Sequence, residues 1–205
     1  MLRDDVKDAC PHLPNCHCHC SRAPQISALG HNLTRKGIWG SVGRYLCLDT
    51  TRKVFDTVCA LRPSSPVRYI VISTEGVDRP DGRDPHRGRM ERLLLWLLKY
   101  VLPPHADNMA NIAYLGTRAA NPSPFIDFCA VRPSDMIDAD PSPYNLHTTL
   151  QNGIFNAGVT SRANVGRFMA DLVTDSKLWR TWKGGYPHIL NEVPPEKSKT
   201  KSKKV

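Results

Sequence analysis

The sequence predicts an α/β fold built around a parallel β-sheet that is covered by helices. Two apolar runs carry this prediction: residues 67–72, which break into Ser73-Thr74-Glu75-Gly76, and residues 125–131, which end in Arg132-Pro133. Short apolar runs closed by polar, Gly or Pro residues are typical of strands buried on both faces of a parallel sheet. A predicted strand over 26–32 and a segment with the apolar spacing of a helix over 49–61 precede the first run. Strand, helix and strand in this order form a parallel crossover unit.

The first 25 residues stand apart from this pattern. Four cysteines and three histidines crowd into residues 10–20, and both residue types bind zinc. The strict Cys-His alternation over 16–20 lacks the Cys-x2-Cys pairs of structural zinc sites, so we expect a poorly ordered leader without a metal. The other three cysteines, Cys47, Cys59 and Cys129, have apolar surroundings and are expected in the core.

Regular elements are predicted from residue 26 to residue 191. We expect strands over 26–32, 67–72, 125–133 and 187–191 (the last at a sheet edge), and helices over 49–61, 90–101, 106–118 and 160–174. Asp49 or Thr50 is the expected N-cap of the first helix. Apolar residues surround most of the helix over 90–101, which predicts burial on more than one side. Trp179 and Trp182 are expected to pack against the core.

The loops over 78–88 and 134–149 follow the carboxyl ends of predicted strands, where ligands bind in open parallel sheets. A short strand is expected over 153–158. Glu75 and Asp107 are predicted to be solvent-facing or capping groups, and His105 a helix-start residue rather than a base. The sequence contains neither a Gly-x-Ser-x-Gly elbow nor a Walker loop, so other common chemistry has no support.

The bulk composition, 40% hydrophobic and 23% charged, is ordinary for a globular chain, and 205 residues suffice for one α/β core. No apolar run is long enough to cross a bilayer, and residues 1–5 lack the apolar core of a secretory signal. We therefore expect a cytoplasmic protein without a membrane partner. The net charge of +9 includes five lysines against one glutamate in residues 196–205, which predicts a solvated tail rather than a specific nucleic-acid site.

Five segments stand in the order that is found in one protein family. They read LGHNLT (29–34), IVISTEG (70–76), PPHADN (103–108), AVRP (130–133) and TSRANVG (160–166). Together with residues 179–191 they resemble the NmrA-like branch of the atypical short-chain dehydrogenase/reductase family. The resemblance implies a Rossmann-type parallel sheet, flanked by helices, that binds NAD(P). It divides the chain into a leader (1–25), a partial NAD(P)-binding domain (26–193) and a Lys-rich tail (194–205).

The resemblance also implies where the cofactor lies, with its nicotinamide side between the strands that end near Ser73 and Pro133. The residues that it places at the cofactor are Gly30, His31, Ser73, Thr74, Asn108, Arg132 and Pro133. The residues themselves leave alternatives open. His31 could be a turn residue, and Arg132 could pair with Asp135 rather than with a phosphate.

Two departures from the family pattern limit the function that can be carried over. No strand, Gly-x-x-Gly-x-x-Gly and helix precede Gly30, so the first strands and the phosphate-binding loop are missing and one sheet edge should be exposed. The family's catalytic Tyr-x-x-x-Lys is also missing: Pro104 stands at the Tyr place and Asn108 at the Lys place. Neither residue can transfer a proton near neutral pH, so no catalytic residue is expected, although Ser73 stands near the family's catalytic Ser.

The sequence therefore predicts an NAD(P)-binding-domain protein that is catalytically impaired or regulatory. One alternative is an NAD(P)H-dependent reductase that other segments complete. Another is a zinc-binding or interaction module that uses the Cys/His leader. A homo-oligomer or a protein partner is compatible with each of these.

Overall fold

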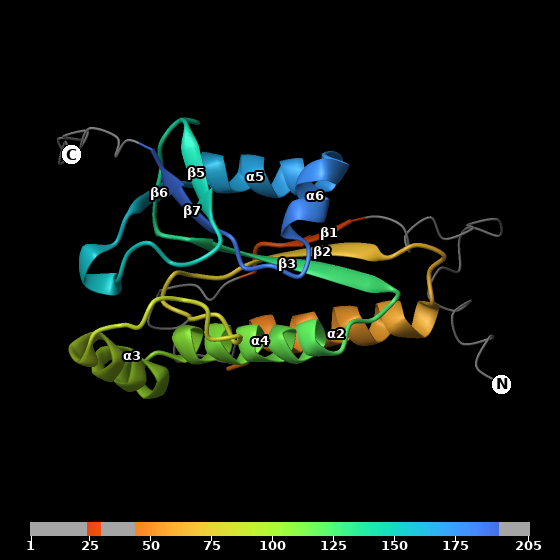
Figure 1. Ribbon diagram of the computed structural model, residues 1–205. Coiled ribbons are helices and arrows are strands. Elements are labelled where there is room, and N and C mark those ends of the chain that lie inside the picture. Colours follow the sequence, from red (N-terminus) through yellow and green to blue (C-terminus); the bar gives the residue numbers. More distant parts are fainter. Residues whose placement is uncertain (1–23, 30–43, 193–205) are drawn as a thin grey trace, which may run out of the picture.

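Within the described chain, five strands form one sheet between two layers of helices (Figure 1). The computed structural model describes residues 24–29 and 44–192. The strand order is β1 (Gln25–Ser27), β2 (Val67–Ile72), β3 (Ile126–Pro133), β7 (His188–Asn191) and β5 (Tyr144–His147). Strands β1, β2, β3 and β7 run parallel, and β5 runs antiparallel to β7. The predicted α/β class with a parallel sheet is confirmed.

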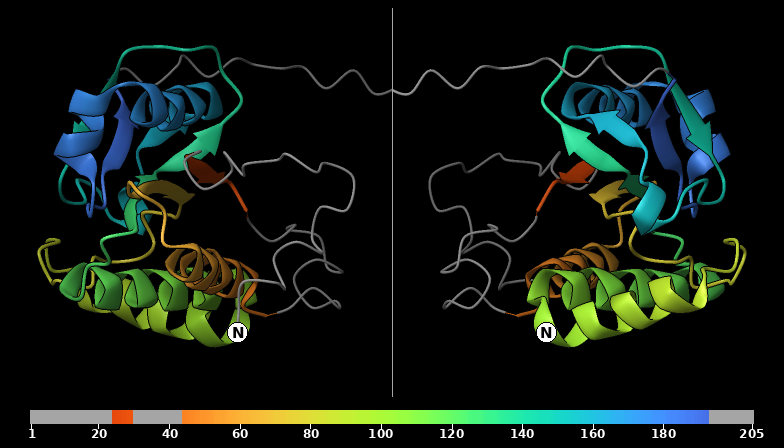
Figure 2. Two further views of the ribbon diagram at one scale, coloured as in Figure 1. Left: turned by 90° about the vertical axis from the view of Figure 1, so that its right-hand side faces the viewer. Right: turned by 90° about the vertical axis from the view of Figure 1, so that its left-hand side faces the viewer.

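Helices cover both faces of the sheet. Helices α2 (Leu46–Leu61) and α4 (Pro103–Ala120) cover one face, and α5 (Arg162–Thr174) and α6 (Ser176–Trp182) cover the other (Figure 2). Helix α3 (Arg89–Val101) lies against α4 on the side that faces away from the sheet. Helix α4 begins directly at its two prolines, which is favourable because the first turn of a helix has no use for their missing N–H groups.

The central strands β2 and β3 are apolar on both faces because each face supports a separate core. Successive side chains of β2 point to opposite sides. Tyr69 and Val71 pack with Phe55 of α2, whereas Ile70 packs with Phe168 of α5. As predicted, Cys47 and Cys129 are buried and Cys59 is half-buried, so these cysteines act as small core residues.

Helix α3 differs from its prediction. The helix is present, but the expected burial on more than one side is wrong. Glu91 is its one buried residue, and six of its large apolar side chains are exposed. Because α4 is the main element that α3 packs on, the apolar residues on the outer side of α3 remain exposed.

The second helix layer is held by polar groups at its ends. The Ser161 hydroxyl accepts a hydrogen bond from the backbone N–H of Asn164 and caps the start of α5. At the other end of α5, Arg68 of β2 donates to the carbonyls of Leu172 and Val173 at 3.2 and 2.8 Å. Trp179 is buried against this layer, as predicted.

The segment between β3 and α5 contains more regular structure than predicted. Strand β4 (Asp135–Ile137) pairs with β6 (Val159–Ser161) in a small parallel sheet. A 3-10 turn, η3 (Ile154–Asn156), replaces the short strand expected over 153–158. The predicted last strand exists as β7, but it lies between β3 and β5, so its expected edge position is wrong. Strand β5, which the Pro-rich composition of 134–149 concealed, forms that edge instead.

Residues 24–29 and 44–192 contain neither a membrane-spanning helix nor a metal-binding cluster. None of the helices there combines the length and the hydropathy that crossing a bilayer requires. These residues also contain no group of three or more His, Cys, Asp and Glu side chains that could hold a metal ion. Residues 1–23 of the Cys/His leader and the Lys-rich tail lie outside the described residues, and so does the stretch over 37–43, which contains three glycines.

Candidate functional site

The carboxyl ends of β2 and β3 bring part of the predicted site together. Backbone hydrogen bonds continue past the last residues of β2: Ser73 N–H donates to the Val131 carbonyl at 2.7 Å, and Glu75 N–H donates to the Pro133 carbonyl at 3.1 Å. The segment after β2 therefore stays beside the end of β3. This places three of the predicted cofactor-binding residues, Ser73, Thr74 and Pro133, next to one another at the sheet edge where Rossmann-type proteins bind ligands.

Ser73 and Thr74 differ in how their hydroxyl groups are used. Ser73 is buried, and its Oγ has no hydrogen-bond partner within the part of the chain that the structure describes. Thr74 is half-buried, and its hydroxyl accepts a hydrogen bond from Gly76 N–H at 3.3 Å, which closes the turn after the strand. A buried hydroxyl without a partner is costly in a native protein, so Ser73 is a candidate ligand contact.

His105 lies opposite Ser73 and Thr74. We call the region between these three residues the Ser73 corner. A Cβ atom at Gly76 would lie 3.7 Å from both Cε1 of His105 and Oγ1 of Thr74, so the three residues are neighbours. His105 stands in the first turn of α4, as predicted, and is buried with no described partner for Nε2. Burial lowers the pKa of His105, the Leu95 carbonyl opposes this effect, and the charge of Arg87 adds to it. The ring is therefore neutral at pH 7.

Asn108, at the place of the family's Lys, lies one turn along α4 from His105 and is half-buried. Gly30 and His31, the remaining predicted residues on this side, lie outside the described residues. A pocket of about 380 Å³ opens beside Gly76 and His105, with Trp96 of α3 on its far wall. A hollow of about 320 Å³ lies at the opposite end of the sheet, beside Val67 at the start of β2, where this fold does not place ligands.

Arg132 does not pair with the predicted partner Asp135. It is fully buried, and its guanidinium donates to the Asp84 carboxylate at 2.6 and 3.2 Å and to the Tyr186 carbonyl at 3.0 Å. The expected partner Asp135 is therefore wrong, because Asp135 is exposed and Asp84 holds the charge instead. With its donors used by the protein, Arg132 is poorly suited to bind a cofactor phosphate.

The contact with Arg132 also affects the pKa of the Asp84 carboxyl. Burial alone would raise its pKa, but hydrogen bonds from Arg132 and from the backbone N–H groups of Arg79 and Leu150 outweigh burial and lower the pKa below its ordinary range. The pair ties the loop after β2 to the end of β3. Its role is structural.

Glu75, Ser134 and His188 form a buried network that sequence reasoning did not find. The Ser134 hydroxyl donates to the Glu75 carboxylate, and His188 Nε2 lies 3.0 Å from the same hydroxyl and 3.4 Å from the carboxylate. The backbone N–H of Gln151 donates to His188 Nδ1 at 3.3 Å, so Nδ1 is an acceptor and we assign a ring proton to Nε2. The prediction of Glu75 as a solvent-facing or capping group is wrong because the carboxylate is buried in this network.

This network contains the residue types of a hydrolase triad but not its arrangement. In a triad the His accepts the Ser proton and the acid contacts the other ring nitrogen. Here the Ser hydroxyl already donates to the carboxylate, and the far ring nitrogen faces a backbone N–H group. The three side chains therefore satisfy one another in the interior. The pairing of His188 with Arg132 across β7 and β3 is what brings His188 there, and no local sequence signal marks it.

Asp107 explains how α2 begins. Its carboxylate accepts hydrogen bonds from the backbone N–H groups of Cys47 and Leu48 at 2.8 and 3.0 Å, so Asp107 of α4 caps α2. The predicted caps Asp49 and Thr50 are wrong, since α2 starts at Leu46. Asp107 does cap, as one of its predicted roles, but from a fully buried position. Because a carboxylate already holds this helix N-terminus, it cannot serve as a phosphate site.

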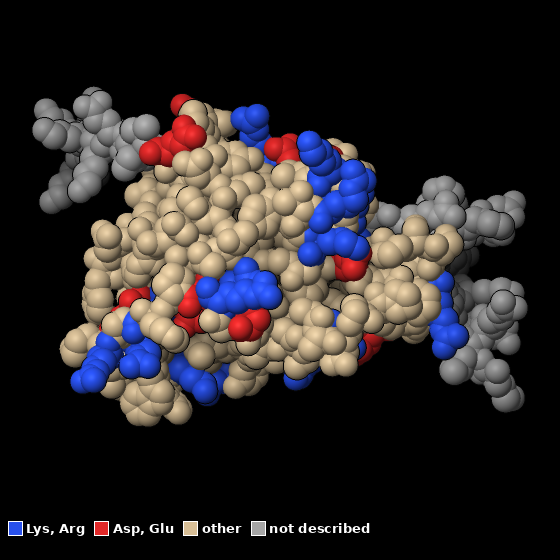
Figure 3. Space-filling model, viewed as in Figure 1, with Lys and Arg blue, Asp and Glu red and all other residues tan. Residues whose placement is uncertain are grey.

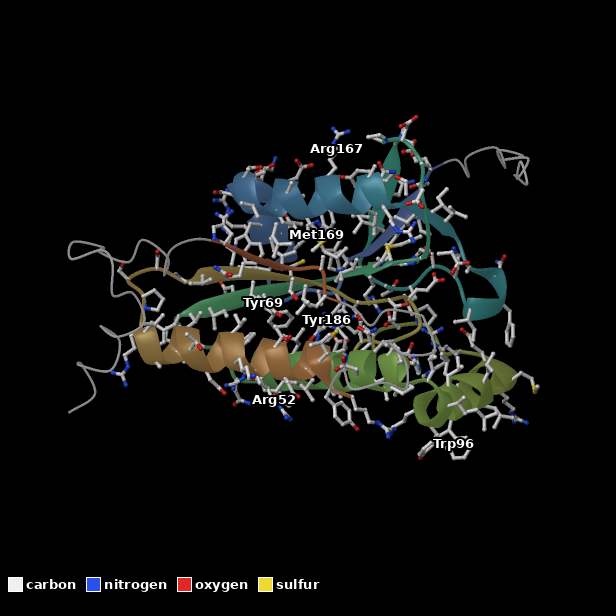
Figure 4. The ribbon with its side chains drawn as sticks, turned by 180° about the vertical axis from the view of Figure 1, so that it is seen from behind. Arg52, Tyr69, Trp96, Arg167, Met169 and Tyr186 are labelled. Carbon is white, nitrogen blue, oxygen red and sulfur yellow. The ribbon has the colours of Figure 1, made fainter. Side chains whose placement is uncertain are left out.

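The described residues do not supply the family's acid–base pair. Pro104 and Asn108 stand on α4 where the Tyr and Lys are expected. Tyr186 is buried in the core below the sheet, on the same side as Tyr69 (Figure 4). Burial raises the pKa of Tyr186 to about 12, and Asp81 adds to this effect. Burial likewise raises the pKa of the Cys47 thiol to about 12, so neither residue is a reactive group near neutral pH.

Comparison with known proteins supports the fold. No protein-family model matches the sequence, and no curated protein matches it. A crystal structure from Lactobacillus casei superposes with a TM-score of 0.54 at 16% identity, over 81% of this chain and 68% of that one. A candidate NADH-flavin reductase from Streptococcus pneumoniae TIGR4 gives 0.48 at 13% identity, over 76% and 70%.

A candidate NAD-dependent epimerase/dehydratase from Bacillus halodurans gives a TM-score of 0.47 at 16% identity, over 82% of this chain but only 64% of that one. This chain thus spans about two thirds of the length of these neighbours. The similarity to the Lactobacillus casei structure shows a shared fold, and the mainly parallel sheet between helix layers is Rossmann-like.

Proposed function

We propose that this chain binds a nicotinamide dinucleotide at the carboxyl ends of β2 and β3 and does not catalyse the family's dehydrogenase reaction. The observation that carries the proposal is the buried Ser73 hydroxyl, which has no partner among the described residues and lies at the ligand-binding edge of a Rossmann-like sheet. A ligand amide or ribose hydroxyl would satisfy it. The names of the similar structures support the same class of ligand.

The described residues fit one half of such a cofactor better than the other. Ser73, Thr74 and Asn108 offer polar groups for the nicotinamide half, and Pro133 supplies an apolar contact beside them. For the pyrophosphate, the nearby start of α2 is already capped by Asp107, and Arg132 is paired with Asp84. We therefore expect weak binding, with Gly30 and His31 as further predicted contacts that lie outside the described residues.

The proposed role is regulatory, because no described side chain can replace the Tyr-x-x-x-Lys pair. When bound, a nicotinamide dinucleotide supplies hydride transfer, but that step needs a positioned proton donor. Pro104 has no proton to give, and the neutral His105 ring would have to act from a buried site. A sensor of cofactor level or redox state needs binding only. A cytoplasmic location stays a prediction.

A second candidate function is a reductase that other segments complete. Within the described chain β1 has a hydrogen-bonded neighbour on one side only, which is β2. An open edge of this kind can accept the strands and the glycine-rich loop that the family places before it. For this candidate, we expect NADPH oxidation to appear when an upstream segment with that loop is added, and not without it.

Thermal unfolding of the full chain with and without millimolar NADPH or NADH tests the first proposal. A ligand at about tenfold its Kd raises the midpoint by about 3–5 °C for a chain of this size. We expect such a rise with wild type and its loss in Ser73→Leu, which fills the corner. Ser65→Ala, an exposed loop serine at the other end of the sheet, is the matched control and should keep the rise. A cooperative transition that neither dinucleotide shifts would contradict the proposal.

A further inference from the structure

The outer side of α3 is an exposed apolar surface. Six side chains make up this surface, which we call the α3 face: Met90, Leu93, Trp96, Leu97, Tyr100 and Val101. Each is between 45% and 70% exposed, on a helix of 13 residues. Apolar groups of this size gathered on one helix are unusual on a free protein surface and mark a site of interaction.

The spacing shows that the α3 face is one continuous stripe. Met90, Leu93, Leu97 and Val101 follow the three- and four-residue steps of one helix side. Trp96 and Tyr100 lie along its border, with ring centroids 5.1 Å apart in an edge-to-face contact. The remaining leucines of α3 are half-buried on the side of α4. Figure 4 shows Trp96 at the outer margin of the molecule, directed away from the sheet.

Basic residues flank this stripe, and no exposed acid of α3 offsets them. Arg92 and Lys99 are seven residues apart, so they lie on the same flank, next to Trp96, and both are exposed. The single acid of α3, Glu91, is buried and paired with Arg87. Figure 3 shows Lys and Arg side chains gathered at the corner of the molecule where α3 lies.

The charges help to identify what covers the α3 face. In a two-fold antiparallel pair of α3 helices, the basic flanks of both copies would fall on the same side. Arg92 and Lys99 would then face the same residues of a second copy, which is unfavourable at short range. An anionic membrane surface has the opposite property. Apolar side chains enter the acyl boundary, Trp and Tyr rings lie at the headgroups, and Lys and Arg contact anionic lipid.

We propose that α3 docks the protein reversibly on anionic membrane surfaces, with the α3 face inserted and Arg92 and Lys99 against lipid headgroups. The sequence-based expectation of no membrane partner rested on the length needed to span a bilayer. A helix that lies in the interface needs only one apolar side. Arg92, Trp96 and Lys99 also line the pocket beside Gly76 and His105. The proposal does not rest on cofactor binding, since neither Ser73 nor Thr74 takes part in it.

Flotation of the full chain with lipid vesicles tests this proposal. We expect binding to phosphatidylcholine vesicles that contain about 30% phosphatidylserine, little binding to phosphatidylcholine alone, and release at high salt. The double variant Arg92→Glu/Lys99→Glu should lower the partition coefficient at least about 20-fold, because each basic residue near an anionic surface contributes about a fivefold factor. Leu97→Ser should lower it as well, because it removes part of the inserted surface.

The matched control is Arg167→Glu/Arg180→Glu, which makes the same change in net charge on the opposite helix layer (Figure 4). It should bind within about twofold of wild type, since charges farther than a Debye length from the surface are screened. All the changed residues are exposed, so unchanged unfolding midpoints should confirm that the variants fold.

Three results would overturn the proposal. The first is no binding to either kind of vesicle. The second is an equal loss in the control, which would indicate net charge alone. The third is concentration-dependent self-association in sedimentation that Leu97→Ser abolishes while vesicle binding is absent, which would assign the face to a second copy. A blue shift of tryptophan emission on anionic vesicles that Trp96→Phe removes would support the inserted orientation.

Discussion

Two clusters of buried polar side chains at the carboxyl edge differ in whether they are paired. On the β3–β7 side, Arg132 pairs with Asp84, and Ser134 bridges Glu75 and His188. On the β2–α4 side, Ser73 Oγ and His105 Nε2 are buried with no partner in the described part of the chain. Both clusters lie at the carboxyl ends of neighbouring parallel strands of one sheet.

This difference in pairing distinguishes residues that hold the fold together from residues that can contact a ligand. Buried polar groups that satisfy one another hold strands and loops together and leave no valence for a ligand. A buried polar group without a partner has lost its hydrogen bonds to water, which costs free energy. A bound molecule that hydrogen-bonds to the group can offset this cost. The paired side therefore positions the edge, and the unpartnered side is the candidate contact surface. Substitutions on the two sides should differ accordingly in stability.

The largest effect is expected at Asp84. Replacing Asp84 by Ala leaves the Arg132 charge buried without a partner and removes the acceptor of two backbone N–H groups. We expect a loss of about 3–5 kcal/mol in the free energy of unfolding, measured by urea titration. Asp81→Ala breaks a partly exposed pair with Arg79 and should cost less than about 1 kcal/mol. Equal losses in the two variants would contradict the assigned role.

Acid titration gives a second readout where Asp84→Ala does not fold. The lowered pKa of Asp84 means that its contribution to stability is present above the unfolded pKa of about 3.9 and is lost as the pH falls through the folded value. Asp84→Asn keeps an acceptor oxygen without the charge. Its stability should therefore depend less on pH below about 4 than that of wild type.

A pair of serine substitutions compares the two sides directly. Ser134→Ala removes the hydroxyl between Glu75 and His188 and should cost about 1–3 kcal/mol, because both partners lose a buried hydrogen bond. Ser73→Ala removes a buried hydroxyl that has no described partner, so without ligand it should cause no loss of stability and should raise stability by up to about 1–3 kcal/mol. Urea titration of both variants checks this. A loss of stability for Ser73→Ala would mean that its hydroxyl is already satisfied.

The sequence predicted the centre of this fold well because the centre obeys local rules. The apolar runs that became β2 and β3 are buried on both faces, and the helices that became α2, α4 and α5 show one apolar side each. The burial of α3 could not be predicted. Its composition is that of a buried helix, and only the tertiary arrangement shows that one neighbour covers it.

The site was predicted in part for the same reason. Ser73, Thr74 and Pro133 follow strand ends, so strand prediction alone places them at one edge. The partners of Arg132 and Glu75 come from segments that are far away in sequence, and the short strands β5 and β7 that align them carry weak signals. Long-range polar pairing depends on strand order, which one sequence does not specify. The expected Arg132–Asp135 pair failed on this point.

The smallest effect is expected in the pH dependence at His105, on the unpartnered side. Its pKa is lowered, first by burial and further by Arg87, against the Leu95 carbonyl. The unfolded chain therefore takes up a proton near pH 6.5 that the folded chain resists, so His105 makes stability fall as the pH drops below that value. His105→Gln should flatten this decline of stability between pH 6.5 and the acid limit.

The comparison variant is His147→Gln. Burial also lowers the pKa of His147, with a further contribution from His188, so this variant should remove a separate part of the slope of stability against pH. Urea titrations at several pH values measure both. If His105→Gln kept the full wild-type slope, Nε2 would have a proton acceptor in the folded protein, and the contrast between the two sides of the edge would fail at this residue.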